Sequence, residues 1–199
     1  METIIKTGYF KIIGLFYADK HARFHLREIA RKARLNENSA TRFLAMLEKE
    51  KILFSEKDGN LKKYSIMKNK KAFFLFSLFD IQRQERLPEK RKNAIKHFLD
   101  YLREKPLIVV LFGSTAKGNF TDKSDIDLLL IVNKKIETGD AEDYADSQTG
   151  IRVGCIQIKY GDFKNEIKIK QDKVIQSALN SGFPVLNHLN FYEAYYESL

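Results

Sequence analysis

Two apolar segments separated by a short polar stretch constrain the fold of this 199-residue chain more than any other feature. Leu107–Phe112 is wholly apolar and lies between a proline and a glycine, which predicts a buried strand. Residues 124–132 read Ser-Asp-Ile-Asp-Leu-Leu-Leu-Ile-Val, which predicts a second buried strand. Asp125 and Asp127 are two positions apart, so on a strand both side chains would point to one face.

The polar residues around these strands have the chemistry of a metal-phosphate site. Two carboxylates held side by side repel each other unless a cation lies between them, and Mg²⁺ favours carboxylates together with substrate phosphates. Gly113 and Ser114 follow the first strand, where glycine lets a phosphate approach the backbone and the hydroxyl adds a hydrogen bond. Lys117 comes three residues after Ser114 and is placed to reach the same phosphates. We therefore expect this segment to bind Mg²⁺ and a phosphorylated ligand.

The pair Gly113-Ser114, ten residues, and then Asp125-x-Asp127 resembles the signature of the polymerase-beta-like nucleotidyltransferase superfamily in its minimal form. The resemblance runs from Leu107 to the end of the chain. It implies transfer of a nucleoside monophosphate from an NTP to a hydroxyl, with release of pyrophosphate. It also implies that Gly113 and Ser114 hold the β- and γ-phosphates, and that Asp125 and Asp127 are the catalytic residues that bind the metal.

The sequence departs from that family at a third carboxylate, which active members carry on a later strand facing the same site. We expect the corresponding strand at residues 150–160, which contains no Asp or Glu, and we align Gln157 with the missing acid. An amide carries no charge and is not a useful base at neutral pH. Asp162 is interpreted as the N-cap of a following helix. Four acids on the preceding loop or helix are alternatives for the third carboxylate: Asp140, Glu142, Asp143 and Asp146.

Charge is distributed unevenly along the chain. The formal net charge is +9, yet residues 1–105 contain 25 basic and 13 acidic residues, whereas residues 106–199 contain 10 and 13. This asymmetry favours a first half that contacts a polyanion, joined to a second half with a different task. A merely solvated basic surface is the alternative.

The first 68 residues have the pattern of a DNA-binding fold. We expect helices at residues 4–17, 25–33 and 39–50, followed by two strands at 52–54 and 61–67 that are joined by a turn at 57–60. This order resembles a winged helix-turn-helix domain, which places the second helix of its central pair in the DNA major groove. The resemblance implies that six residues contact duplex DNA: Asn38, Ser39, Thr41, Arg42, Lys62 and Lys63. The alternative is that this domain docks to proteins or dimerises.

We therefore expect an α+β chain in three parts. Residues 1–68 form the winged helix domain, 69–105 a helical linker, and 106–199 a nucleotidyltransferase domain with a small mixed sheet flanked by helices. The segment Lys71–Arg86 is apolar around much of its circumference, which predicts burial between the domains or pairing in a homodimer. Near the C-terminus we expect a helix with a break at 163–180, a short strand at 182–186 and a last helix from Phe191.

Other features limit the class of protein. A single cysteine, Cys155, excludes an internal disulfide framework and a cysteine-based zinc site. The longest apolar runs are too short to span a membrane, and the first residues lack a secretory layout, so a cytoplasmic location is expected. Three functions stay open: a transferase that acts on a hydroxyl acceptor such as a toxin-like protein, a DNA-binding regulator whose weakened transferase domain senses NTP, and a docking module without either activity.

Overall fold

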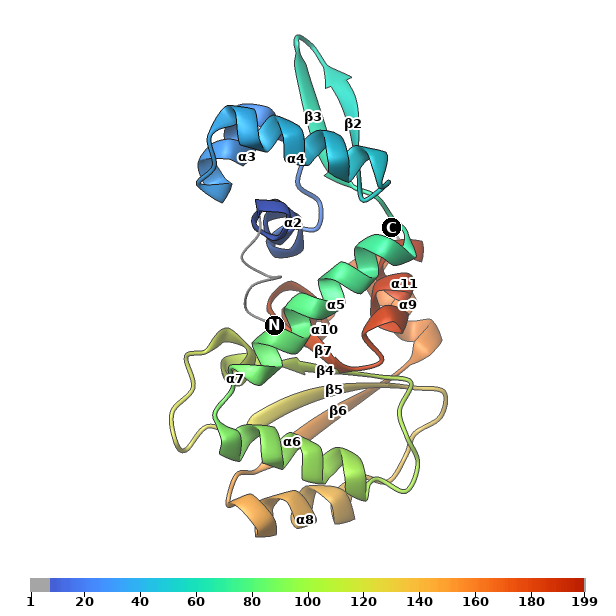
Figure 1. Ribbon diagram of the computed structural model, residues 1–199. Helices are drawn as coiled ribbons and strands as arrows, with labels where there is room; N and C mark the ends of the chain where they lie inside the picture. Colours follow the sequence, from blue (N-terminus) through green and yellow to red (C-terminus); the bar gives the residue numbers. More distant parts are fainter. Residues whose placement is uncertain (1–7, 199) are drawn as a thin grey trace. The chain divides into compact units, whose positions relative to one another are not determined.

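The computed structural model describes residues 8–198, and the chain separates into two compact units, Met1–Phe79 and Asp80–Leu199 (Figure 1). The first unit contains α2 (Gly8–Ala18), β1 (Phe24–His25), α3 (Leu26–Ala33), α4 (Glu37–Lys49), β2 (Leu53–Asp58) and β3 (Leu61–Ile66). Helix α5 (Lys70–Glu85) begins in the first unit and ends in the second. Within the described residues, no helix is both long enough and apolar enough to cross a membrane.

The first unit packs α2, α3 and α4 against one another, and α3 and α4 contact a small antiparallel sheet with strand order β1-β3-β2. The expected helix at residues 4–17 is α2, although its first positions, including Ile5, lie outside the described residues. Helix α4 begins at Glu37, two residues earlier than expected, because Asn36 caps it by accepting a hydrogen bond from the Ser39 backbone N–H at 2.8 Å. Strand β1 was not predicted from the sequence, since two residues carry no detectable alternation.

The turn of the β2–β3 hairpin depends on glycine. The register pairs Asp58 with Leu61, so the loop is Gly59-Asn60, and Gly59 adopts φ +58°. Because only glycine enters this backbone region at little cost, the expected hairpin forms at this position.

The second unit is a four-stranded mixed sheet with helices on both faces, in the order β6-β5-β4-β7. Its elements are α6 (Glu89–Tyr101), β4 (Ile108–Phe112), α7 (Gly113–Lys117), β5 (Ile126–Val132), α8 (Gly139–Thr149), β6 (Val153–Lys159), α9 (Tyr160–Ile169), α10 (Lys173–Ser181), β7 (Phe183–Leu186) and α11 (His188–Glu197). Strands β5 and β6 are parallel, whereas β4 is antiparallel to both β5 and β7. The expected mixed sheet flanked by helices is therefore confirmed, as is the break between α9 and α10.

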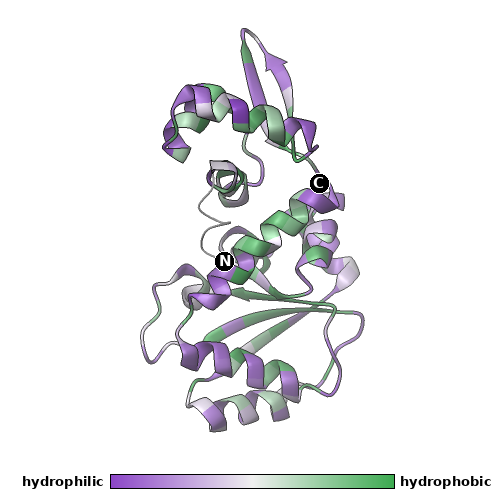
Figure 2. Cartoon of the chain, in the orientation of Figure 1, coloured by the Kyte–Doolittle hydropathy of each residue, from purple (hydrophilic) through white to green (hydrophobic). Residues whose placement is uncertain are grey.

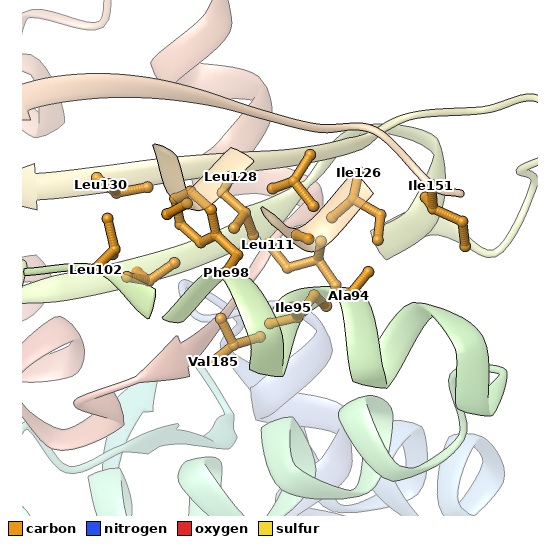
Figure 3. Packing of buried hydrophobic residues seen from close by; sticks show 14 of the residues in the cluster. Ala94, Ile95, Phe98, Leu102, Leu111, Ile126, Leu128, Leu130, Ile151 and Val185 are labelled. Atoms are coloured by element: carbon orange, nitrogen blue, oxygen red, sulfur yellow. The ribbon is translucent and has the colours of Figure 1, made fainter. Parts of the chain in front are cut away.

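The main hydrophobic core lies between one face of this sheet and helices α6 and α8 (Figures 1 and 3). Alternate residues of β5, from Ile126 to Val132, point into it and meet Ile95 and Phe98 of α6. Figure 2 shows the central strands in hydrophobic colours, which agrees with the burial of every residue of β4 and β5 except Asp127. Helix α6 falls within the segment that we expected to be a linker, but its apolar face packs into this core, so it is part of the second unit.

The opposite face of the sheet is covered by α9, α10 and α11. Since side chains alternate along β5, Asp127 lies on this face with Leu129 and Ile131. The face on which a side chain of β6 lies matters for function, because it can approach Asp127 only from the same face of the sheet.

Candidate nucleotide site

The candidate site is built where β4 ends and β5 begins. Phe112, the last residue of β4, pairs with Asp127 of β5, and the chain then turns into the single-turn helix α7 at Gly113. Gly113 has φ +70°, a conformation that residues with a side chain rarely adopt. A Cβ atom at this position would stand 2.9 Å from Cγ of Asp127, so the carboxylate fills the space that a side chain would need. The expected proximity of Gly113 and Asp127 is present.

The two acids lie close together, but only one is on the strand. Strand β5 begins at Ile126, so Asp125 is in the preceding loop, and the expectation that both acids belong to the strand was wrong. The backbone carbonyl of Asp125 accepts a hydrogen bond from the Thr115 hydroxyl at 3.3 Å, which holds the loop against α7. Burial, and then the charge of Asp125, raise the pKa of the Asp127 carboxyl above its usual value.

Neither carboxylate of the pair has a close polar partner among the described side chains, although the charge of Arg91 acts on Asp125. Within residues 8–198, the side chains of Asp125 and Asp127 have no hydrogen bond and no ion pair, and the hydroxyl of Ser114 has no hydrogen bond. Lys117 is exposed in the last turn of α7. Gly113, Ser114 and the two acids therefore lie together where β4 ends and β5 begins, and the side chains of Ser114, Asp125 and Asp127 have no close polar partner in the described residues.

These residues fit a divalent cation that binds together with a ligand. No group of three or more His, Cys, Asp or Glu side chains comes together in the described part of the chain, so a closed all-protein metal cage is not present there. Two carboxylates suit Mg²⁺, which keeps several positions for water and phosphate oxygens. Asp125 and Asp127 would hold the ion, and a bound Mg²⁺ would supply charge neutralisation for a triphosphate.

The third acid of the family pattern is absent from the site, and Gln157, which we aligned with it from the sequence, does not occupy the corresponding position. In the parallel register, Asp127 is opposite Gly154 and Leu130 is opposite Gln157, so Gln157 lies on the other face of the sheet from Asp127. Its side-chain amide donates to the backbone carbonyl of Ile136 at 2.8 Å and accepts from the Ile136 N–H at 3.0 Å. The alignment of Gln157 with the missing acid was therefore wrong.

The site face of β6 carries only apolar positions. These are Gly154, Ile156 and Ile158, and a Cβ atom at Gly154 would meet nothing within 4 Å. The sheet thus leaves open space beside Asp127 where a carboxylate would be useful. Strand β6 therefore supplies no acid, as the sequence predicted, and the residue directly opposite Asp127 is Gly154.

None of the acids considered as substitutes reaches the site. Helix α8 carries all four alternatives and packs against α6 on the opposite face, where Asp140 pairs with Arg103 at 3.0 Å and Glu142 accepts from the Cys155 thiol. Asp162 is not a cap, because α9 begins at Tyr160 and places Asp162 in its first turn.

Arg91 is the site-related residue that the sequence reasoning missed. It is only 3% exposed, and its guanidinium donates hydrogen bonds to Thr115 and to two carbonyls of the loop before Asp125. A signal was present in the sequence: Arg91, Ala94, Ile95 and Phe98 are the buried residues of α6 at helical spacing, so a charged residue stands in an otherwise apolar stripe.

Two cavities of the second unit lie away from the acid pair. One, of about 540 Å³, is at the carboxyl ends of β5 and β6 near Val132 and Lys159, at the opposite end of β5 from Asp127. The other, of about 370 Å³, lies between the end of α6 and the start of α8. The candidate site is therefore recognised by its side chains and backbone geometry, and neither of these two cavities includes the acid pair.

Comparison with known proteins agrees with this site. Residues 93–187 match the family model described as "Polymerase beta, Nucleotidyltransferase". The match includes β4, α7, β5 and β6, and hence every residue of the candidate site except Arg91. This part of the second unit is therefore similar to polymerase-beta-like nucleotidyltransferase domains. Searches among curated proteins and solved structures found no match.

Proposed function

We propose that the second unit binds a nucleoside triphosphate together with Mg²⁺. Asp125 and Asp127 bind the ion, Gly113 and Ser114 bind the phosphates, and Lys117 adds a positive charge to the same ligand. The observation that carries this proposal is a pair of adjacent carboxylates, one held against Gly113, with no protein cation or donor bound to either in the described residues. Such a pair is costly to keep ionised unless a cation joins it.

The test is an equilibrium titration with ATP, GTP, CTP and UTP, each with and without Mg²⁺. We expect magnesium-dependent binding of at least one triphosphate and its loss in Asp127→Ala. Thermal denaturation checks that the variant is folded. The absence of any magnesium-dependent signal in the unsubstituted chain would refute the proposal.

Binding without transfer is favoured over a full transferase reaction. The observation behind this choice is the apolar site face of β6, where Gly154 offers open space and no acid. Loss of a general base typically lowers a rate by about 10²–10⁴-fold. We therefore propose that the domain senses NTP in a regulator, with transfer to a hydroxyl acceptor as the second candidate. Incubation with labelled NTP, Mg²⁺ and candidate protein acceptors distinguishes them, because only a transferase leaves covalent label.

The first unit is proposed to be a winged helix-turn-helix domain that binds duplex DNA. Its order of elements, α2-β1-α3-α4-β2-β3, with β3 between β1 and β2, supports this assignment. On α4, Asn38, Thr41 and Arg42 are exposed and Ser39 is partly buried. These are the residues that the resemblance assigns to the major groove.

The two hairpin lysines are already engaged in ion pairs. Lys62 contacts Glu48 at 2.9 Å and Lys63 contacts Asp58 at 2.8 Å. A phosphate would have to compete with these carboxylates, so we expect Arg42 to contribute more to DNA affinity than either lysine.

Fluorescence anisotropy with a labelled duplex at several salt concentrations tests DNA binding. Each phosphate contact contributes a slope of about −0.9 in log K against log salt. We expect Arg42→Ala to weaken binding, and Arg103→Ala, which removes an exposed arginine of the second unit, to leave it unchanged. Equal effects of the two substitutions, or a salt-independent signal, would contradict a specific role for α4.

A homodimer and a protein acceptor of the toxin-like class are further proposed partners. The apolar helix α5 exposes Phe74 and Ile81, which supports self-association through this helix. Light scattering on the purified chain measures the mass in solution, and a monomer at micromolar concentration would refute the dimer.

A further inference from the structure

Arg91 forms a buried polar centre beside the acid pair. One terminal nitrogen, Nη1, donates to the Thr115 hydroxyl at 2.7 Å, and the other, Nη2, donates to the carbonyls of Thr121 and Ser124 at 2.9 and 2.8 Å. The guanidinium also stacks on the ring of Phe120, 4.2 Å from its centroid. Among residues 8–198 it forms no close ion pair, although the charges of Asp122 and Asp125 act on it, and its hydrogen bonds go to α7 and to the loop that follows α7.

The acceptors of Arg91 stand next to the proposed ligands in the sequence. Thr115 directly follows Ser114, and Ser124 directly precedes Asp125. The Thr115 hydroxyl accepts from Arg91 and donates onward to the Asp125 carbonyl at 3.3 Å. A chain of hydrogen bonds therefore runs from Arg91 to the backbone of the first acid.

The loop between α7 and β5 depends on this centre for its shape. Inside the loop, the Ser124 hydroxyl accepts a hydrogen bond from the Thr121 backbone N–H at 2.9 Å, which closes a local turn. The carbonyls of these same two residues point to Arg91. Without the guanidinium, the Ser124 carbonyl and the Thr115 hydroxyl would lose their donor, and the Thr121 carbonyl would keep only the Ser124 backbone N–H at 3.0 Å. The turn would then no longer be fixed against α6.

We propose that Arg91 is a positioning residue for the nucleotide site: it holds Asp125 in register with Ser114 and Asp127 so that one metal-triphosphate ligand can be bound by all three. The proposal rests on the nucleotide binding proposed above and assigns a role to a residue outside the segment matched by the family model. Arg91 acts through Thr115 and Ser124 and does not itself contact the ligand.

A second arginine offers a matched control. Arg83 donates hydrogen bonds to the carbonyls of Ala116 and Ser181 at 3.0 Å, and it stacks on Phe183 at 4.1 Å. Like Arg91, it joins separate elements of the second unit through backbone carbonyls and an aromatic ring. None of these contacts involves the loop that carries Asp125, so its loss should affect stability without changing the position of the acid.

The experiment compares Arg91→Met, Arg91→Lys and Arg83→Met in the full chain. Calorimetric titration with Mg²⁺ and the triphosphate that binds the unsubstituted chain best gives the Kd, and circular dichroism gives the Tm. Titrations are made well below the lowest Tm. Residues that orient metal ligands typically change metal affinity by about 10–100-fold when they are mutated. We expect Arg91→Met to raise Kd by this factor, Arg91→Lys to recover part of the loss, and Arg83→Met to lower Tm while changing Kd by less than about twofold.

Several outcomes would overturn the proposal. Equal Kd values for Arg91→Met and Arg83→Met, with both proteins folded, would show that Arg91 is only structural. If Arg91→Met does not fold, Thr115→Val replaces it, because this change removes the hydroxyl that links Arg91 to Asp125; an unchanged Kd would then refute the role. If the unsubstituted chain shows no magnesium-dependent binding, the proposed function fails and this proposal fails with it. A failure confined to Arg91 leaves the binding function intact.

Discussion

Replacing Gly113 with alanine is the most direct perturbation of the proposed site. Two costs arise in the folded chain. The first is the left-handed backbone, φ +70°, which costs a residue with a Cβ about 1–2 kcal/mol. The second is steric, because the new methyl group would stand 2.9 Å from Cγ of Asp127 and closer still to its Oδ2, so the carboxylate must move. Overpacking of this kind typically costs about 1–3 kcal/mol.

The two costs sum to roughly 2–5 kcal/mol of unfolding free energy. For a unit of this size, each kilocalorie per mole shifts Tm by roughly 3–5 °C, so we expect a fall of about 6 °C or more. Displacement of Asp127 should also weaken magnesium-dependent triphosphate binding by more than about tenfold, which corresponds to about 1.4 kcal/mol. Calorimetry on the same samples measures both quantities.

Gly118→Ala is the matched control for this experiment. Gly118 has a similar backbone conformation, φ +74°, but a Cβ atom there would meet nothing within 4 Å. It should therefore show the backbone cost alone, about 1–2 kcal/mol, and near-normal binding. If Gly113→Ala and Gly118→Ala have the same Tm and the same Kd, the contact between Gly113 and Asp127 has no energetic significance and the reasoning is refuted.

Three further outcomes follow from the structure. Asp127→Asn should raise the free energy of unfolding at pH 7, because burial and the charge of Asp125 raise the pKa of Asp127 and make its ionised form costly in the fold. This gain should shrink as the pH falls through the raised pKa toward 3.8. Denaturant titrations that show a constant gain between about pH 7 and pH 4 would contradict this prediction. Burial raises the pKa of the Cys155 thiol to about 12, so iodoacetamide should alkylate it at pH 8 about 10³-fold more slowly than an ordinary thiol. Equal alkylation rates in the native protein would show that the thiol is not buried and hydrogen-bonded as described. Gln157→Ala should cost about 1–3 kcal/mol by leaving the Ile136 backbone groups unpaired, yet leave triphosphate affinity unchanged; weakened binding would restore Gln157 to the site.

Elements with a strong local pattern were predictable from the sequence. Strands β4 and β5 are apolar runs of sufficient length, and the hairpin between β2 and β3 has a glycine turn, so each has its own signal in neighbouring residues. The site residues at the end of β4 and the start of β5 were predictable for the same reason, since a short segment of chain carries them all.

Features that depend on pairing between distant segments were not predictable. The sequence of β6 does not show which of its residues face Asp127, because the parallel register with β5 determines this. Gln157 is three positions from Gly154, the residue opposite Asp127, so its side chain lies on the other face of the sheet. Asp125 was placed on the strand because the apolar pattern marks its end only to within a residue or two. Arg91 was missed because its partners lie 24 to 33 positions further along the chain.

The location of Arg91 bears on how this protein can be divided for experiments. A fragment cut at residue 93, where the family resemblance begins, would retain Gly113, Ser114 and both aspartates and would look complete by sequence. It would also lack the guanidinium that donates to the Thr115 hydroxyl of α7 and to two loop carbonyls in the intact chain. Inactivity of such a truncated protein would therefore not show that the intact domain is inactive, whereas a fragment that begins at Asp80 retains the whole compact unit.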